Sequence, residues 1–142
     1  MEILKIKTEK RELGNFGEEA AVKFLKKAGY QIKMRNYVSF NNEVDIVAED
    51  GYAVAFVEVK TRDVENLSPN EPRPASAVNP KKQRGIVAAA AAYMAYYRPQ
   101  KHARLDIIEV YVKKGTRGYE VVEIKHLKDA FNRNTAYGRK RR

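Results

Sequence analysis

Residues 42–62 read NEVDIVAEDGYAVAFVEVKTR, and this stretch decides the fold. Two runs rich in valine, isoleucine and alanine flank Asp50-Gly51, a dipeptide typical of short hairpin turns. We therefore expect two strands, at residues 43–49 and 52–60, that pair across this turn. Four charged residues interrupt the apolar runs and need an explanation: Glu43, Asp45, Glu58 and Lys60.

A helix and a strand are predicted ahead of the hairpin. Asn15, followed by Glu18 three residues later, is typical of a capping box, and apolar residues then recur at helical spacing. We therefore expect a helix over residues 16–28 and a strand over residues 31–38.

A proline-rich loop follows the hairpin, over residues 61–80. At its end, Asn79-Pro80 is typical of the start of a helix, and Pro99 predicts where that helix has ended. The remaining predicted elements are strands over residues 105–112 and 119–124 and a short helix over residues 126–132. The order αβββαββ indicates an α/β fold.

The length of 142 residues suits one domain. We assign residues 13–132 to it, residues 1–12 to an N-terminal extension and residues 133–142 to a basic C-terminal tail. No apolar run approaches the roughly 20 residues that cross a bilayer. The N-terminus also lacks the apolar core of a signal peptide, so a cytoplasmic protein is expected.

The composition excludes several kinds of chemistry. The chain has no cysteine, which rules out disulfides, thiolate zinc sites and cysteine nucleophiles, and it has only two histidines. Any catalysis must therefore depend mainly on carboxylates, lysine and arginine. The net charge of +10 favours a polyanionic partner, either nucleic acid or an anionic membrane surface.

The charged residues of the hairpin are expected to meet on one face of the sheet. Side chains alternate along a strand, so Asp45 and Glu58 share a face, one diagonal step apart, while Glu43 faces Glu58 directly. Buried carboxylates this close require a compensating positive charge. Lys60 supplies one, and Mg²⁺ or Mn²⁺ would suit the oxygen ligands. The alternative is a solvated face, although three apolar residues of the same strands share it.

Asp45 followed after a hairpin by Glu58-Val59-Lys60 resembles the PD-(D/E)xK nucleases, which have the restriction-endonuclease-like fold. A closer resemblance, over residues 14–131, is to the YraN family of bacterial proteins, which are similar to Holliday-junction resolvases. The matching pieces are Gly17-Glu18 with Ala21, Gly29-Tyr30, Arg35-Asn36, Glu43-Val44-Asp45, residues 56–62, Lys82, Arg104-Leu105-Asp106 and Ala130-Phe131. Asn42 replaces the usual glycine, and we expect it to tolerate a left-handed turn.

The resemblance implies a restriction-endonuclease-like core, a mixed β-sheet flanked by helices, and a metal-dependent endonuclease acting on DNA, including branched or damaged DNA. Asp45 and Glu58 would hold Mg²⁺ or Mn²⁺, with the Val59 carbonyl as a further ligand. Lys60 would orient the attacking water and stabilise the transition state. Glu18 would be another catalytic metal ligand, and its alternative role is in the capping box.

Basic residues at the start of the second helix indicate a nucleic-acid site. Lys81, Lys82 and Arg84 occupy its first turn, where the helix dipole disfavours cations and favours phosphate. Gln83 is expected to line the same site, and Arg62 to contact the backbone of a bound strand. The alternative is that these residues are ordinary exposed side chains.

Three functions are therefore weighed for the chain. The first is a nuclease, and the second is a non-catalytic nucleic-acid-binding protein with a nuclease-like fold. The third, a basic protein–protein adaptor, leaves Asp45, Glu58 and Lys60 unexplained. Symmetric cutting of a DNA junction requires two sites, so a homodimer fits by analogy.

Overall fold

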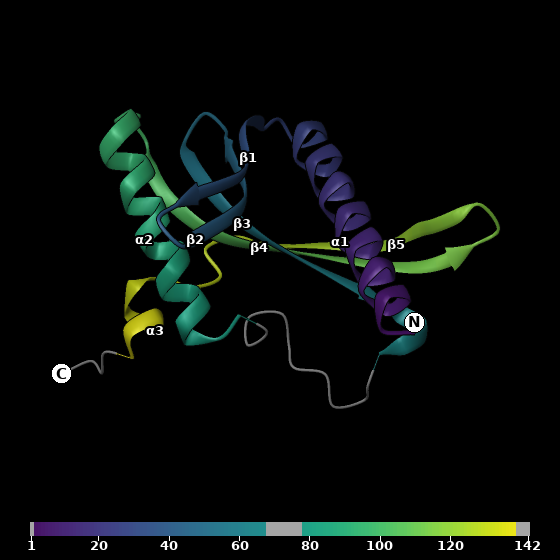
Figure 1. The fold of residues 1–142 in the computed structure, drawn as a ribbon. Coiled ribbons are helices and arrows are strands. Elements are labelled where there is room, and N and C mark those ends of the chain that lie inside the picture. Colours follow the sequence, from purple (N-terminus) through teal and green to yellow (C-terminus); the bar gives the residue numbers. More distant parts are fainter. Residues whose placement is uncertain (1, 68–77, 139–142) are drawn as a thin grey trace.

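The computed structural model describes residues 2–67 and 78–138, which form a five-stranded mixed sheet with flanking helices (Figure 1). The strands lie side by side in chain order, β1 to β5. Their bounds are Gln31–Ser39, Asn42–Glu49, Ala53–Asp63, His102–Gly115 and Gly118–Leu127. Strands β3 and β4 pair in parallel, and the other three neighbouring pairs are antiparallel. The predicted α/β fold with a mixed sheet is confirmed.

Helices cover the two faces of the sheet. Helix α1 (Glu2–Lys27) packs against the face that carries Val57, whereas helix α2 (Pro80–Tyr97) packs against the face that carries Phe56. Neighbouring residues of a strand point to opposite faces, so Phe56 and Val57 divide the core into two halves. In the described part of the chain, no helix is long and apolar enough to span a membrane.

Helix α1 begins at Glu2, well ahead of the predicted residue 16. Asn15 therefore lies inside the helix, and the predicted capping box is wrong. Lysine, glutamate and leucine dominate residues 2–13 and favour a helix, and Leu13 and Phe16 pack against the core. This packing carries the helix through Gly14 and Asn15. Residues 2–12, assigned to an extension, are the first turns of α1.

The turn between β2 and β3 is wider than predicted. Glu49 pairs with Val54, not with residue 52. The cause is the side chain of Asp50, whose Oδ1 accepts hydrogen bonds from the N–H groups of Tyr52 and Ala53 at 2.7 and 2.9 Å. The register shifts by two residues, so the paired residues 46–49 and 54–57 keep their predicted faces.

The turn between β1 and β2 also differs from the expectation. Asn42 pairs with Ser39 as a strand residue, and the left-handed backbone (φ 54°) falls on Phe40 instead. Asn42 faces α2, where a Cβ atom added at Gly85 would lie 2.7 Å from Asn42 Oδ1. The hairpin and α2 therefore approach each other closely at this point.

Helix α2 begins as predicted. Asn79 is the N-cap, its Oδ1 accepts a hydrogen bond from the Lys82 N–H at 2.9 Å, and Pro80 is the first helical residue. Arg98, in a left-handed conformation, ends the helix before Pro99. The link from β3 contains a short 3-10 helix, η1 (Val64–Asn66). Pro69, Pro72 and Pro74 of the predicted loop lie outside the described residues.

The C-terminal elements differ from the prediction. Strand β5 continues to Leu127, so the predicted helix over residues 126–132 is wrong. His126 is held on the strand because its Nε2 lies 2.8 Å from Asp106 Oδ2 of β4. Helix α3 (Arg133–Tyr137) follows, within the segment assigned to the basic tail, and Arg139–Arg142 lie outside the described residues.

Candidate active site

Asp45 of β2 and Glu58 of β3 lie at the point where the two strands part. The last paired residues of the two strands are Ile46 and Val57. In an antiparallel pair the next residues, Asp45 and Glu58, lie opposite each other. The predicted diagonal relation is therefore wrong, although both acids line the same cavity. Asp45 Oδ2 accepts a hydrogen bond from the Val59 N–H at 2.8 Å, which fixes this carboxylate between the strands.

Both acids have raised pKa values. Glu58 is buried, and its Oε2 has no hydrogen-bond partner in the described part of the chain. Burial, followed by the charge of Asp45, raises the pKa of Glu58 to about 7. Burial also raises the pKa of Asp45, against the opposing effect of the Val59 hydrogen bond. Adjacent acids of this kind are typical of sites that bind a cation or transfer protons.

Two lysines bring positive charge from different elements. Lys60 Nζ of β3 and Lys82 Nζ of α2 each lie 3.9 Å from Glu58 Oε1. This distance exceeds that of a hydrogen bond, so the lysines compensate the charge of Glu58 only in part. Lys82 approaches the sheet because Asn79 and Pro80 fix where α2 begins.

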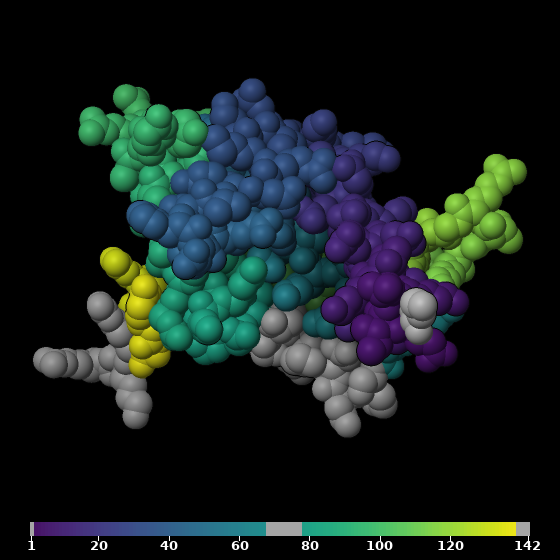
Figure 2. Space-filling model, in the orientation of Figure 1, coloured from purple at the N-terminus to yellow at the C-terminus, as the bar shows by residue number. Residues whose placement is uncertain are grey.

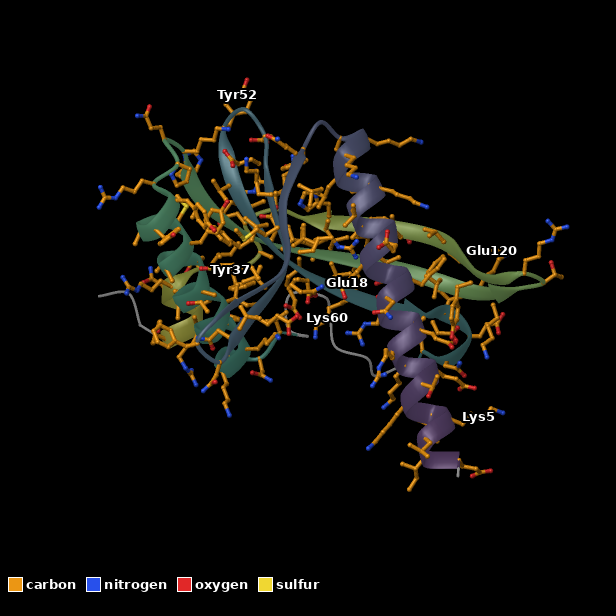
Figure 3. The ribbon with its side chains drawn as sticks, turned by 45° about the horizontal axis from the view of Figure 1, so that its top comes forward. Lys5, Glu18, Tyr37, Tyr52, Lys60 and Glu120 are labelled. Atoms are coloured by element: carbon orange, nitrogen blue, oxygen red, sulfur yellow. The ribbon has the colours of Figure 1, made fainter. Side chains whose placement is uncertain are left out.

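Helix α1 contributes Glu18 from the other side. Glu18 lines a cavity of about 410 Å³ together with Asp45, Glu58 and Lys60. Figure 3 shows Glu18 and Lys60 close together between α1 and the strands, and Figure 2 shows the surface recessed beside the purple α1. Burial first, and the charge of Asp45 second, raise the pKa of Glu18. Since Asn15 is no cap, the capping role proposed for Glu18 is excluded.

Lys10 lines the same cavity, although it belongs to none of the motifs that predicted the site. It reaches the cavity because α1 begins at Glu2. Lys10, Gly14 and Glu18 are spaced by four residues and therefore follow one face of the helix. That spacing is the signal that would have identified Lys10, had the helix been extended toward the N-terminus.

Asn36 is a second residue whose role in the site was missed. When the side-chain amide of Asn36 is turned so that its nitrogen faces the acids, this nitrogen donates to Glu18 Oε1 at 3.3 Å and to Glu43 Oε1 at 3.2 Å. The Asn36 backbone is left-handed (φ 51°), a conformation that asparagine adopts more readily than most residues. Asn36 therefore links β1 to the acids on α1 and β2.

The residues predicted to bind nucleic acid lie in different surroundings. Lys81 and Lys82 line a second cavity, of about 300 Å³, between α2 and the β1–β2 turn. Gln83 does not line it, contrary to the expectation. Its side chain is buried, because Nε2 donates to the Val78 carbonyl at 2.8 Å and Oε1 accepts from the Thr135 hydroxyl at 3.1 Å.

Arg84 and Arg62 lie apart from the second cavity. Arg84 Nη1 donates to the Ala136 carbonyl at 3.1 Å, so this side chain joins α2 to α3. Arg62 follows Lys60 on β3 by two residues and is half-buried. Because side chains alternate, Arg62 points to the same face of the sheet as Lys60.

The donor set fits a hard divalent cation with few protein ligands. Within residues 2–67 and 78–138, no three carboxylate or imidazole groups are already arranged around one point as a cage. Asp45 and Glu58 nevertheless offer oxygen ligands, and Glu58 Oε2 is buried without a partner among these residues. Mg²⁺ is commonly held by one or two carboxylates and several waters, so these two residues suffice for its binding.

Comparison with known proteins gives consistent matches over most of the chain. Residues 17–110 match the model of "Uncharacterised protein family UPF0102". A UPF0102 protein of Chlorobium phaeobacteroides is 40% identical over 122 residues, which are 84% of this chain and 94% of that protein. A UPF0102 protein of Caldicellulosiruptor saccharolyticus is 43% identical over 124 residues, 86% and 98% of the two chains. The matched range includes Glu18, Asp45, Glu58 and Lys60 but not Lys10.

Proposed function

The chain belongs to the UPF0102 family, the YraN family that its motifs predicted, and we propose that it is a metal-dependent nuclease that hydrolyses phosphodiester bonds in DNA. The observation that supports this function best is the opposition of Asp45 and Glu58, two acids with raised pKa values, beside Lys60. Packing such acids together lowers the stability of a fold. A bound cation offsets this loss of stability, because it neutralises the charge of both carboxylates.

The proposed chemistry divides between the cation and the chain. When bound, Mg²⁺ or Mn²⁺ would lower the pKa of a water and neutralise charge on the phosphate. Asp45 is oriented in advance by the Val59 N–H. Lys60 lies beside Glu58, where its ammonium group would orient the attacking water and stabilise negative charge that develops on the phosphate.

The surroundings of the site suit a nucleic-acid backbone. Lys10 from α1, Lys60 from β3 and Lys82 from α2 place positive charge around the acids from three elements. The whole chain carries a net charge of +10. Lysine–phosphate contacts release condensed counterions, so the proposed DNA binding should weaken steeply as salt is added.

The test combines metal binding with cleavage. Mn²⁺ binding is measured by calorimetry, and Mg²⁺- and Mn²⁺-dependent cleavage is followed on linear, nicked, flapped and four-way DNA. Asp45→Asn and Glu58→Gln should lose both metal binding and cleavage, whereas Lys60→Ala should retain metal and lose cleavage. Glu120→Gln, at an exposed acid far from the site (Figure 3), should behave as wild type. Unchanged Mn²⁺ affinity in Asp45→Asn and Glu58→Gln would contradict the proposal.

A non-catalytic DNA-binding protein is the second candidate. One observation favours it: Lys60 and Lys82 already compensate Glu58 in part, so the site is not wholly dependent on a metal. For such a protein, salt-dependent DNA binding should persist in Asp45→Asn and Glu58→Gln. No variant, including wild type, should then cleave any of the four DNA structures.

A further inference from the structure

Phe40 forms the tip of the β1–β2 hairpin. Ser39 and Asn42 are the last pair of the two strands, so Phe40 and Asn41 alone make the turn. The Phe40 side chain is 95% exposed, the highest value among large apolar side chains in the described part of the chain. Its backbone is in the left-handed region, with φ 54°.

Phenylalanine is a poor choice for this position as far as folding is concerned. Left-handed backbone suits glycine or asparagine, and it is rare for a bulky side chain. The exposed ring of Phe40 also gains none of the stabilisation that burial of an apolar side chain provides. Backbone strain of this kind clusters at binding sites, which indicates that the ring binds a group outside the chain.

We propose that Phe40 stacks on an unpaired base of the DNA, which makes branched or locally single-stranded DNA the preferred substrate. This inference rests on the proposed function and names its substrate class. Aromatic rings stack on any base that exposes a face, without regard to sequence. Within a duplex both faces of a base are covered by its neighbours, whereas a branch or flap leaves one face free.

The hairpin tip adjoins the positive side of the candidate active site. Asn41 and Asn42 line the cavity of about 300 Å³ together with Lys81 and Lys82. Lys82 also extends toward Glu58. In Figure 1 the hairpin lies beside α2, and contacts between α2 and both strands confirm this arrangement. Phosphates held by the two lysines would therefore lead from the hairpin tip toward the acids.

The spacing along β2 limits how far the stacked base lies from the cut. Phe40 precedes Asp45 by five residues. With a rise of about 3.3 Å per residue, the two lie at most about 17 Å apart along the strand. Nucleotides of one DNA strand are spaced by about 3.4 Å, so cleavage is expected within about five nucleotides of the unpaired base.

Phosphate contacts and base stacking have separate roles in this arrangement. Lysines hold a DNA backbone without distinguishing one structure from another. Phe40 adds affinity only where a base is free to stack. Loss of one stacked base lowers affinity by a factor of roughly 5 to 150.

The experiment measures binding of a labelled four-way junction and of a linear duplex by fluorescence anisotropy, with Ca²⁺ in place of Mg²⁺. Phe40→Asn removes the ring and retains a residue that tolerates left-handed backbone. It should therefore raise the melting temperature, lower junction affinity by a factor of roughly 5 to 150, and leave duplex affinity unchanged. Phe40→Trp should retain the junction affinity. A 2-aminopurine at the branch should lose fluorescence with wild type but not with Phe40→Asn.

Tyr52→Ala is the matched control. Tyr52 is also an exposed aromatic residue in a hairpin turn, at 81%, but it belongs to the β2–β3 turn. Figure 3 labels it far from Glu18 and Lys60. This variant should bind the junction as wild type does.

Equal junction affinity of wild type and Phe40→Asn would overturn the inference, even if the protein cleaves DNA. The inference would also be overturned if Phe40→Asn bound DNA as wild type does but no longer bound vesicles of anionic lipid. Phe40 would then belong to a membrane-binding surface. Junction binding that depends on Phe40, in a protein that cleaves no DNA, would support the stacking role and contradict the nuclease proposal alone.

Discussion

Gly17 of α1 lies so close to Thr61 of β3 that a Cβ atom at position 17 would overlap the threonine side chain. The backbone of α1 therefore rests directly on the strand that carries Glu58 and Lys60. Glu18 is the next residue of the helix, so this contact determines how far its carboxyl group reaches into the cavity. Close packing explains a glycine here, although glycine costs a helix about 0.5–1 kcal/mol relative to alanine.

Replacing Gly17 by alanine is expected to displace α1 and withdraw Glu18 from the site. Overpacking of this kind lowers the free energy of unfolding by about 1–3 kcal/mol, and metal affinity should fall with it. Gly14→Ala, on the same helix, is the control, because an added Cβ there meets nothing within 4 Å. It should raise stability by up to about 1 kcal/mol. Urea unfolding measures the stability of both variants. The account would be contradicted if both substitutions changed the free energy of unfolding in the same direction.

Glu58 is expected to make the metal-free protein less stable as the pH rises. Its pKa is about 7 in the folded state and 4.5 in the reference state. Between these values the unfolded chain has lost a proton that the folded chain retains, so the free energy of unfolding falls with increasing pH. The fall is on the order of 3 kcal/mol. Asp45 and Glu18, whose pKa values are also raised, act in the same direction.

Urea titrations in EDTA at about pH 5 and about pH 8 measure this effect. Glu58→Gln should flatten most of the pH dependence and be the more stable protein at the higher pH. Added Mg²⁺ should also restore stability at the higher pH, because a bound cation favours ionised carboxylates. Wild-type stability that is constant or increasing over this range would show that Glu58 is not buried beside Asp45.

Lys10 and Glu18 lie two four-residue steps apart on α1 and line the same cavity, which predicts a phosphate contact at Lys10. Lys10→Ala should weaken DNA binding at low salt and reduce the slope of log affinity against log salt by about 1. Metal affinity should stay unchanged. Lys5→Ala is the control, because Lys5 lies on the same helix away from Glu18 (Figure 3). Anisotropy titrations at several salt concentrations measure this slope. An equal reduction of the slope in Lys10→Ala and Lys5→Ala would refute the contact at Lys10.

Asp106 is expected to stabilise the fold without affecting the site. It is fully buried, accepts hydrogen bonds from Arg104 Nε and the Asp129 N–H at 2.9 Å, and contacts His126. Removing one partner from a buried ionic group costs about 3–5 kcal/mol, so Asp106→Asn should lower the urea midpoint strongly. Mn²⁺ affinity of the folded fraction should stay as in wild type. A loss of metal affinity in folded protein would place Asp106 in the functional machinery.

The sequence predicts those parts of the fold that local signals determine. Alternating apolar residues identify β2 and β3, and Asn79-Pro80 identifies the start of α2. The predicted start of α1, at residue 16, is wrong because packing of Leu13 and Phe16 against the core carries the helix through Gly14 and Asn15. The hairpin register was wrong because the Asp50 side chain closes a wider turn than the dipeptide itself indicates.

The candidate site is predictable to a similar extent. Strand alternation alone predicts that Asp45, Glu58 and Lys60 meet, and all three line one cavity. The contributions of Lys10 and Asn36 depend on how α1 and β1 pack against these strands, which no short pattern contains. The sequence also gives no sign that Gln83 turns into the core, because this depends on Thr135 of α3, far away along the chain.

The central claim is that Asp45 and Glu58 together hold one divalent cation. A crystal soaked in Mn²⁺ tests it directly through the anomalous difference map. The account predicts one peak between the two carboxylates, at about 2.0–2.3 Å from their oxygens, with Lys60 Nζ directed into the cavity. A map with no peak there, and with Lys60 and Lys82 still beside Glu58, would contradict it.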